Sequence, residues 1–119
     1  MEAGHSVLKL YMSSTDKLGN QLLYEQIVHL AKDKGIGGVT VYRGIMGYGL
    51  SSKHISSSKF WELTEKLPIV VEMIDHTNIL ENFYQLIEPD LIKLPKGCLA
   101  TLEPLQVKLH KPGVNKEIS

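Results

Sequence analysis

The segment Pro68–Asp75, PIVVEMID, restricts the possible folds more than any other part of the sequence. Successive side chains of a β-strand point to opposite faces of a sheet. Apolar residues fall on both faces here, Ile69, Val71 and Met73 on one, and Val70 and Ile74 beside Glu72 on the other. Because a strand that is apolar on both sides is usually covered on both sides, we expect protein over each face. An ordinary hydrated face that carries some apolar atoms is the alternative.

Three other segments have the pattern of β-strands. Ser6–Met12 alternates between two faces, Gly38–Arg43 is rich in β-branched residues, and Cys98–Leu109 is expected to form the last strand. Pro104 interrupts this last strand, which indicates a bulge or a place at the edge of the sheet.

Two segments are predicted to form amphipathic helices. The first begins after Asn20 and is stopped by Gly35, which suits the left-handed conformation of a helix end. The second begins with a capping box of Asn78 and Glu81 and ends at Pro89. Their apolar stripes are Leu23, Ile27, Leu30 and Ala31 in the first helix, and Ile79, Phe83, Leu86 and Ile87 in the second.

The resulting order is βαββαβ, which is the ferredoxin-like α+β plan: an antiparallel sheet with both helices on one face. The second and fourth strands are then the edges. Two helices cover only one face, while Tyr11 and Tyr42 fall on the other. We therefore expect a single domain over residues 1–119, with a loose tail at 110–119, whose uncovered face packs on other subunits.

Composition excludes several classes of protein. Thirteen basic and thirteen acidic residues balance, which gives no electrostatic case for a nucleic-acid partner. Cys98 is the only cysteine, so an internal disulfide and a cysteine-based zinc site are excluded. The amino-terminal residues lack signal features, and no run approaches the length of a membrane span. A cytoplasmic protein without membrane insertion is the expectation.

Catalytic and metal-binding patterns are weak. The five histidines have no spacing typical of a metal site. Glu72 and Asp75 are three residues apart on a strand, so they point to opposite faces and do not form an acid–base pair. We expect neither an enzyme nor a metal centre.

The link from Gly44 to Leu67 is unusually long, since loops beyond about 12–15 residues in compact domains are usually functional or disordered. It opens with RGIMGYG at the end of a strand, where glycines allow positive φ and bare amides that bind anions. A bulge or hinge is the simpler interpretation of the glycines alone. A salt bridge from Arg43 to Glu72 or Asp75 is likewise simpler than a ligand contact. Residues 50–59 are predicted to form a mobile loop; the following KFWELTEKL suits a helical turn or a strand extension.

A second turn, in LPKGCLATLE, places Lys96 and Gly97 just before the last strand. A lysine beside free amides suits a phosphate. A solvated turn lysine is the simpler interpretation of this turn alone. The second and fourth strands are opposite edges of the sheet, so the two turns approach each other only in an oligomer.

The segments TVYRGIMGYG, LPIVVEMID and LYEQIVHLAKDKGIGGVTV resemble the PII-like domain-of-unknown-function family, related in fold to the PII nitrogen-regulatory signal transduction proteins. The resemblance spans Val7 to Val107. It implies a homotrimer with inward-facing sheets. It also implies that an adenine nucleotide (ADP, AMP or ATP) binds in clefts between subunits.

The resemblance also assigns residues. Gly47, Tyr48 and Gly49 match the GxG that lines the PII nucleotide cleft, with Arg43 and Gly44 at its start, and Lys96 and Gly97 match the turn that binds phosphates. Lys108 and Lys111 are loose equivalents of the carboxy-terminal arginine pair of PII. Arg43 is then a phosphate or interface contact, or it fixes the base of the loop. The partner-contacting loop corresponds to Leu50 to Lys59 and includes Ser51, Ser52, Lys53 and His54; the uridylylated tyrosine motif of PII is absent from it.

The function implied is that of a nucleotide-responsive trimeric regulator that presents a ligand-ordered loop to a partner protein. A trimeric binding or structural protein like CutA, binding a metal or another small ligand without nucleotide sensing, is the alternative. A slow nucleotide hydrolase is a third possibility, for which no residue constellation argues.

Overall fold

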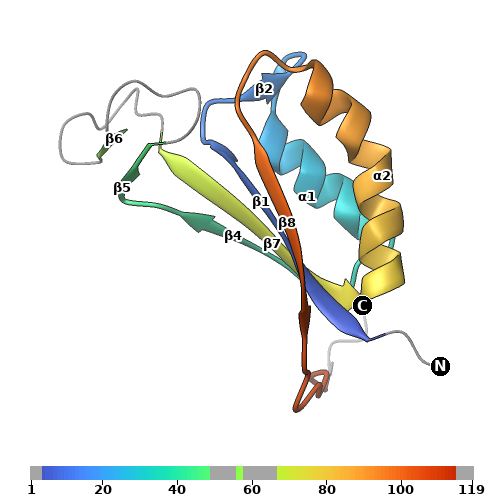
Figure 1. The fold of residues 1–119 in the computed structure, drawn as a ribbon. Helices are drawn as coiled ribbons and strands as arrows, with labels where there is room; N and C mark the ends of the chain where they lie inside the picture. Colours follow the sequence, from blue (N-terminus) through green and yellow to red (C-terminus); the bar gives the residue numbers. More distant parts are fainter. Residues whose placement is uncertain (1–3, 49–55, 58–66, 115–119) are drawn as a thin grey trace.

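A computed structural model describes residues 4–48, 56–57 and 67–114. Its centre is a four-stranded antiparallel sheet with the strand order β4-β7-β1-β8, and both helices lie on one face of it (Figure 1). The strands are β1 (His5–Ser13), β4 (Val39–Arg43), β7 (Pro68–His76) and β8 (Leu99–Leu105), and the helices are α1 (Leu23–Asp33) and α2 (Thr77–Lys93). The ferredoxin-like α+β prediction is therefore confirmed.

Four short strands add two small hairpins that the sequence did not indicate. β2 (Lys17–Leu18) pairs with β3 (Gln21–Leu22), and β5 (Met46–Gly47) pairs with β6 (Ser56–Ser57). The first hairpin turns through Gly19, which has a φ of 67°. It leads directly into α1.

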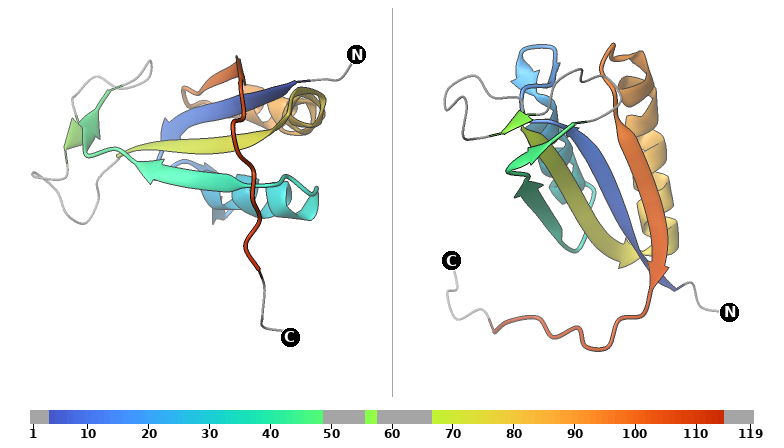
Figure 2. Two further views of the ribbon diagram at one scale, coloured as in Figure 1. Left: turned by 90° about the horizontal axis from the view of Figure 1, so that it is seen from below. Right: turned by 60° about the vertical axis from the view of Figure 1, so that its left-hand side comes forward.

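The edges of the sheet lie where they were predicted, at β4 and β8. Pro104 pairs with Ser6 in the register of β8 and β1, and an edge strand tolerates the missing N–H of proline. β8 is shorter than predicted, because it ends at Leu105 rather than Leu109. Residues 106–114 continue beyond the end of the sheet without regular structure (Figure 2).

The core lies between the helices and the inner face of the sheet. Leu10, Val71 and Met73 from the two central strands are fully buried against it. The stripe of α1 is as predicted, since Leu23, Ile27 and Ala31 are buried and Leu30 packs on the core. The helix is followed by Gly35, whose φ of 82° is the left-handed conformation expected of a helix stop.

Three predictions about α2 are wrong. The helix begins at Thr77, so Asn78 and Glu81 form no capping box, and His76 takes the N-cap position without a side-chain cap. Pro89 lies inside the helix rather than at its end; burial of Ile87 before it and Leu91 after it favours continuation of the helix over the lost backbone bond. The buried stripe is displaced from the predicted one, with Leu86 exposed and with Leu80, Phe83, Ile87 and Leu91 buried.

Hydrogen bonds of Thr77 with Gly4 and Ser6 join the start of α2 to the start of β1, where no side chain caps the helix. The amide and the hydroxyl of Thr77 both donate to the Gly4 carbonyl, at 2.8 and 2.9 Å. The Ser6 and Thr77 hydroxyl oxygens are 2.5 Å apart. These bonds hold residues 4–6 and 75–77 together at one end of the sheet.

The face opposite the helices, here called the outer face, carries a row of apolar side chains across all four strands. Register partners of an antiparallel pair lie on the same face, and Tyr42 pairs with Val70, Val70 with Tyr11, and Tyr11 with Leu99. Tyr42 is 50% exposed, Tyr11 37% and Leu99 53%. Contiguous exposed apolar surface on a small protein marks an interaction site.

Replacement of Leu99 by glutamate tests whether another subunit covers this face. Leu86 on α2 provides a matched control, because it is 52% exposed against 53% for Leu99 and lies on the helix side of the molecule. If another subunit covers this face, Leu99→Glu should sediment as a smaller species than the unsubstituted protein, since a charge would be buried without a partner, while Leu86→Glu should sediment like the unsubstituted protein. Equal sedimentation of the two variants would contradict an interface on the outer face.

Candidate functional site

Most of the predicted nucleotide-binding residues that the structure describes fall at one end of the sheet, but on its two opposite edges. Arg43 is the last residue of β4, and Gly44–Tyr48 continue from that edge into the β5–β6 hairpin (Figure 1). Lys96 and Gly97 lie in the turn between α2 and β8, at the other edge. Lys96 is exposed, and Tyr48 is 76% exposed.

Within one chain these two groups are far apart. Two strands, β7 and β1, separate β4 from β8. With neighbouring strands 4.7–4.9 Å apart, the edges are separated by about 14 Å. One chain therefore holds the predicted residues in two separate groups, here called the half-sites, at opposite edges of the sheet.

Arg43 does not form the salt bridge that composition favoured. It pairs in register with Ile69, a buried inner-face residue, whereas Glu72 lies on the outer face opposite Lys9 and Thr40. Asp75 is on the inner face but six residues from Ile69, about 20 Å along the strand.

Each of the two acids has another partner instead. Glu72 accepts a hydrogen bond from the Tyr42 hydroxyl at 3.3 Å. Asp75 accepts from the amides of Gly37 and His76, at 2.8 and 2.7 Å. The guanidinium of Arg43 is exposed at the glycine-bearing edge, where a ligand or a second subunit can reach it.

A close contact that the sequence did not indicate explains why glycine occupies positions 44 and 47 at this edge. Neither Gly44 nor Gly47 has a positive φ. A Cβ on Gly44 would lie 2.9 Å from Cγ of Pro68, and one on Gly47 would lie 3.1 Å from the same atom. The Gly44 amide also donates to the Pro68 carbonyl at 2.7 Å, so it is not a bare amide as expected.

Pro68 is thus the residue that sequence reasoning missed. It begins β7, and the chain leaving β4 packs closely over its ring. Leu67, the residue before Pro68, is also held by two hydrogen bonds to Ser14. The Ser14 amide donates to the Leu67 carbonyl at 2.8 Å, and the Ser14 hydroxyl accepts from the Leu67 amide at 3.1 Å. A proline at the start of a strand next to a glycine-rich exit is the signal that could have indicated this contact.

Lys108 does not lie with the other predicted residues. β8 begins beside Tyr11 and ends beside His5, so Lys108, three residues beyond Leu105, lies past the opposite end of the sheet. It belongs to the segment 106–114, which extends away from the body (Figure 2). Its role stays a prediction.

Several predicted residues lie outside the part of the chain that the structure describes. They are Gly49, Ser51, Ser52, Lys53 and His54. Most of the predicted loop 50–59 and of KFWELTEKL is also outside it, although Ser56–Ser57 pairs with Met46–Gly47 as β6.

Cys98 follows the Lys96–Gly97 turn directly. Burial raises the pKa of its thiol, and the nearby Asp16 carboxylate raises it further. Asp16 is itself buried and accepts a hydrogen bond from the Ser13 amide at 3.0 Å. Because a thiolate is the reactive form, Cys98 is a poor nucleophile at neutral pH.

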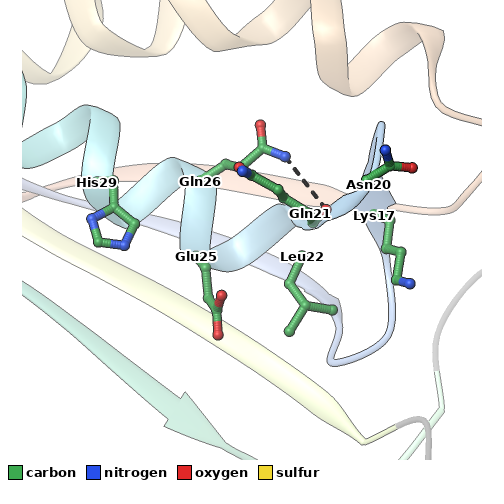
Figure 3. A pocket seen from close by; sticks show the side chains of 7 residues that line it. All are labelled: Lys17, Asn20, Gln21, Leu22, Glu25, Gln26 and His29. Atoms are coloured by element: carbon green, nitrogen blue, oxygen red, sulfur yellow. Dashed lines mark hydrogen bonds between the residues drawn. The ribbon is translucent and has the colours of Figure 1, made fainter.

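Two surface pockets lie on α1 and the β2–β3 hairpin. One, of about 560 Å³, is lined by Lys17, Asn20, Gln21, Leu22, Glu25, Gln26 and His29 (Figure 3). The other, of about 380 Å³, lies between α1 and α2. No predicted site residue lines either of these two pockets.

The described residues contain no cluster of three or more histidine, cysteine or acidic side chains suited to a metal. Among the same residues, neither helix has the length and apolar character needed to cross a bilayer.

Comparison with known families decides the classification. The model of the DUF190 family (Uncharacterized ACR) matches residues 5–107. This chain belongs to the DUF190 family. It is 33% identical over 96 residues to the UPF0166 protein MJ1524 of Methanocaldococcus jannaschii, a match that covers 77% of this chain and 87% of the relative.

Solved structures confirm the PII-like fold. CPII of Thiomonas intermedia K12, a nitrogen regulatory PII-like protein bound to ADP, AMP and bicarbonate, superposes with a TM-score of 0.63, 14% identity and 87% coverage of both chains. A putative PII-like signaling protein of Thermus thermophilus superposes with a TM-score of 0.62 and 17% sequence identity, and the match covers 90% of this chain and 93% of that one. The divalent ion tolerance protein CutA1 of Ehrlichia chaffeensis superposes with a TM-score of 0.57 and 9% sequence identity, and the match covers 91% of this chain and 88% of that one.

Replacement of Gly44 by alanine tests the contact with Pro68. The added Cβ is expected to lower the free energy of unfolding by about 1–3 kcal/mol through overpacking. Gly38→Ala is the control, because a Cβ there meets nothing within 4 Å. Urea denaturation at one protein concentration measures both variants. In the Pro68→Ala background the cost of Gly44→Ala should fall; an unchanged cost would show that the proline ring is not the obstacle.

Proposed function

We propose that this member of the DUF190 family is a homotrimeric PII-like signalling protein. It binds an adenine nucleotide in clefts between subunits and presents part of residues 50–59 to a partner protein. The proposal rests chiefly on the division of the candidate site between the two edges of the sheet. Two strands separate Arg43 from Lys96 within one chain, which favours a ligand site formed by two chains.

The outer face supplies the reason for association. Tyr11, Tyr42, Val70 and Leu99 form a row that helices of the same chain do not cover. Burying such surface against other subunits is favourable by roughly 25 cal/mol per Å² of apolar area. Association through this face would bring the β4 edge of one subunit near the β8 edge of the next.

The chemistry of the two half-sites suits a nucleotide. Arg43 and Lys96 are exposed cations at the same end of the sheet, and side chains of both types can form strong hydrogen bonds to phosphate oxygens. Tyr48 is an exposed aromatic ring beside the glycine-bearing edge, where it can stack on a base. Gly44 and Gly47 let the chain pass over Pro68 and thereby place Tyr48.

The solved structures support the nucleotide class. CPII, which shares the fold, was determined with ADP, AMP and bicarbonate, and with ADP and bicarbonate. At 14% identity this likeness carries the fold only; the nucleotide is therefore inferred from the fold together with the two cationic edges.

Partner recognition is assigned to the segment that follows the glycines. We propose that Ser51, Ser52, Lys53 and His54 contact a regulated protein and that nucleotide binding next to them alters their population of conformations. The β5–β6 hairpin joins this segment to the glycine-bearing edge, so a ligand at that edge lies close to its base.

Isothermal titration with AMP, ADP and ATP tests the site. We expect a dissociation constant in the micromolar range, about −8 kcal/mol, for at least one nucleotide. Lys96→Ala should weaken binding roughly 10- to 100-fold, because it removes a charge-assisted hydrogen bond of about 1.5–3 kcal/mol. Lys93→Ala is the control, since Lys93 is an exposed cation at the end of α2, three residues away.

Two results would contradict the proposal. The first is the absence of heat with all three nucleotides at high protein concentration. The second is an equal loss of affinity in Lys93→Ala and Lys96→Ala, which would indicate general electrostatic attraction rather than a site at the turn.

A further inference from the structure

Two histidines that are 71 residues apart in the sequence face each other across the central strands. His5 opens β1, His76 closes β7, and the two are register partners. Their ring centroids are 4.3 Å apart and their planes are tilted by 36°. Both side chains lie on the outer face, at the end of the sheet opposite Arg43 and Lys96.

From this geometry we infer that His5 and His76 form a chelating pair for a late first-row divalent cation such as Zn²⁺, Ni²⁺ or Cu²⁺. Imidazole nitrogens are ligands that these ions prefer. Two imidazoles on one tetrahedral ion, with metal–nitrogen distances of 2.0–2.1 Å, have their ligating nitrogens about 3.3 Å apart. The ring centroids are 4.3 Å apart and the planes are inclined by 36°, so a small movement of the two side chains away from each other would let one nitrogen of each ring bind the same ion.

The backbone around the pair is already fixed, which lowers the entropic cost of binding. Thr77 donates its amide and hydroxyl to the Gly4 carbonyl, and its hydroxyl contacts that of Ser6. The His76 amide donates to Asp75 at 2.7 Å. These bonds hold the residues on both sides of each histidine. In the single chain His76 is exposed on the outer face and His5 is partly exposed.

The surroundings favour a modest affinity. The neighbouring outer-face positions are occupied by Val7, Ile74 and Leu105, and the exposed Glu103, the register partner of Val7, lies diagonally across from His5. No third histidine, cysteine or acidic residue of the described chain completes the group, so water fills the remaining positions of the ion. A dissociation constant in the micromolar range follows for Zn²⁺, with tighter binding of Cu²⁺ in the usual order of these metals.

Titration calorimetry of the full chain with Zn²⁺ at pH 7.5 tests the pair. We expect His5→Gln and His76→Gln each to weaken binding by at least about tenfold, since even second-shell partners of metal ligands are worth 10–100-fold. His29→Gln is the matched control, because His29 is exposed on α1, away from the pair. Mg²⁺, which prefers oxygen ligands, should produce no binding heat. Affinity for Zn²⁺ should fall as the pH is lowered, because a ligating imidazole must be deprotonated.

The variants are compared by circular dichroism, so that loss of binding is not mistaken for loss of fold. Three results would overturn the inference: no Zn²⁺ binding up to about 1 mM, near the weak end of specific affinities; unchanged affinity in both variants; or an equal loss in His29→Gln. The outcome is independent of nucleotide binding, because Arg43 and Lys96 lie at the other end of the sheet.

Discussion

The pairing of β1 with β7 is the constraint on which the rest of the structure depends. These two strands occupy the centre of the sheet and pair over nine residues, from His5–His76 to Ser13–Pro68. On the inner face they bury Leu10, Val71 and Met73 under the helices. On the outer face they carry Tyr11, Val70 and Ile74, which the described residues leave partly or largely exposed. A second layer of protein over this face is the simplest way to remove that apolar surface from water.

The same topology places the two half-sites apart. Because β1 and β7 are central, β4 and β8 are the edges of the sheet. Gly44 and Gly47, which follow β4, and the Lys96–Gly97 turn, which precedes β8, are therefore about 14 Å apart across the sheet. Subunit association through the outer face would bring the glycines after β4 of one chain close to the Lys96–Gly97 turn of another. The proposed oligomer and the proposed ligand site would thus both follow from one strand order.

Much of the fold could be predicted from the sequence, because the strand and helix periods are strong. The strand order, the edge position of Pro104 and the helix stop at Gly35 are confirmed. The errors came from tertiary contacts that a local pattern does not contain. Burial of Leu91 carries α2 past Pro89, and the bonds from Thr77 to Gly4 replace the expected capping box.

Prediction of the candidate site was less successful for the same reason. The glycines were interpreted as bare, ligand-binding backbone. Gly44 and Gly47 are instead required because a Cβ at either position would crowd the ring of Pro68, which lies more than 20 positions later in the chain. A salt bridge from Arg43 to an acid was the simpler interpretation of composition alone, but Glu72 lies on the other face of β7 and Asp75 lies six residues along the strand from Ile69, the register partner of Arg43. The pairing of His5 with His76 follows only from the register of β1 and β7. Contacts of this kind require the fold before they can be inferred.

The central claim is that one nucleotide site is built from two chains, and mixing of subunits tests it most directly. Arg43→Ala and Lys96→Ala chains, each of which should bind nucleotide at least tenfold more weakly alone, are unfolded together in equal amounts and refolded. If the site lies between subunits, random assembly of trimers restores both residues in about one cleft in four, and titration with the tightest-binding nucleotide recovers that fraction at the original affinity. Recovery of no high-affinity sites from mixed trimers would show that each site lies within a single chain and would contradict the account.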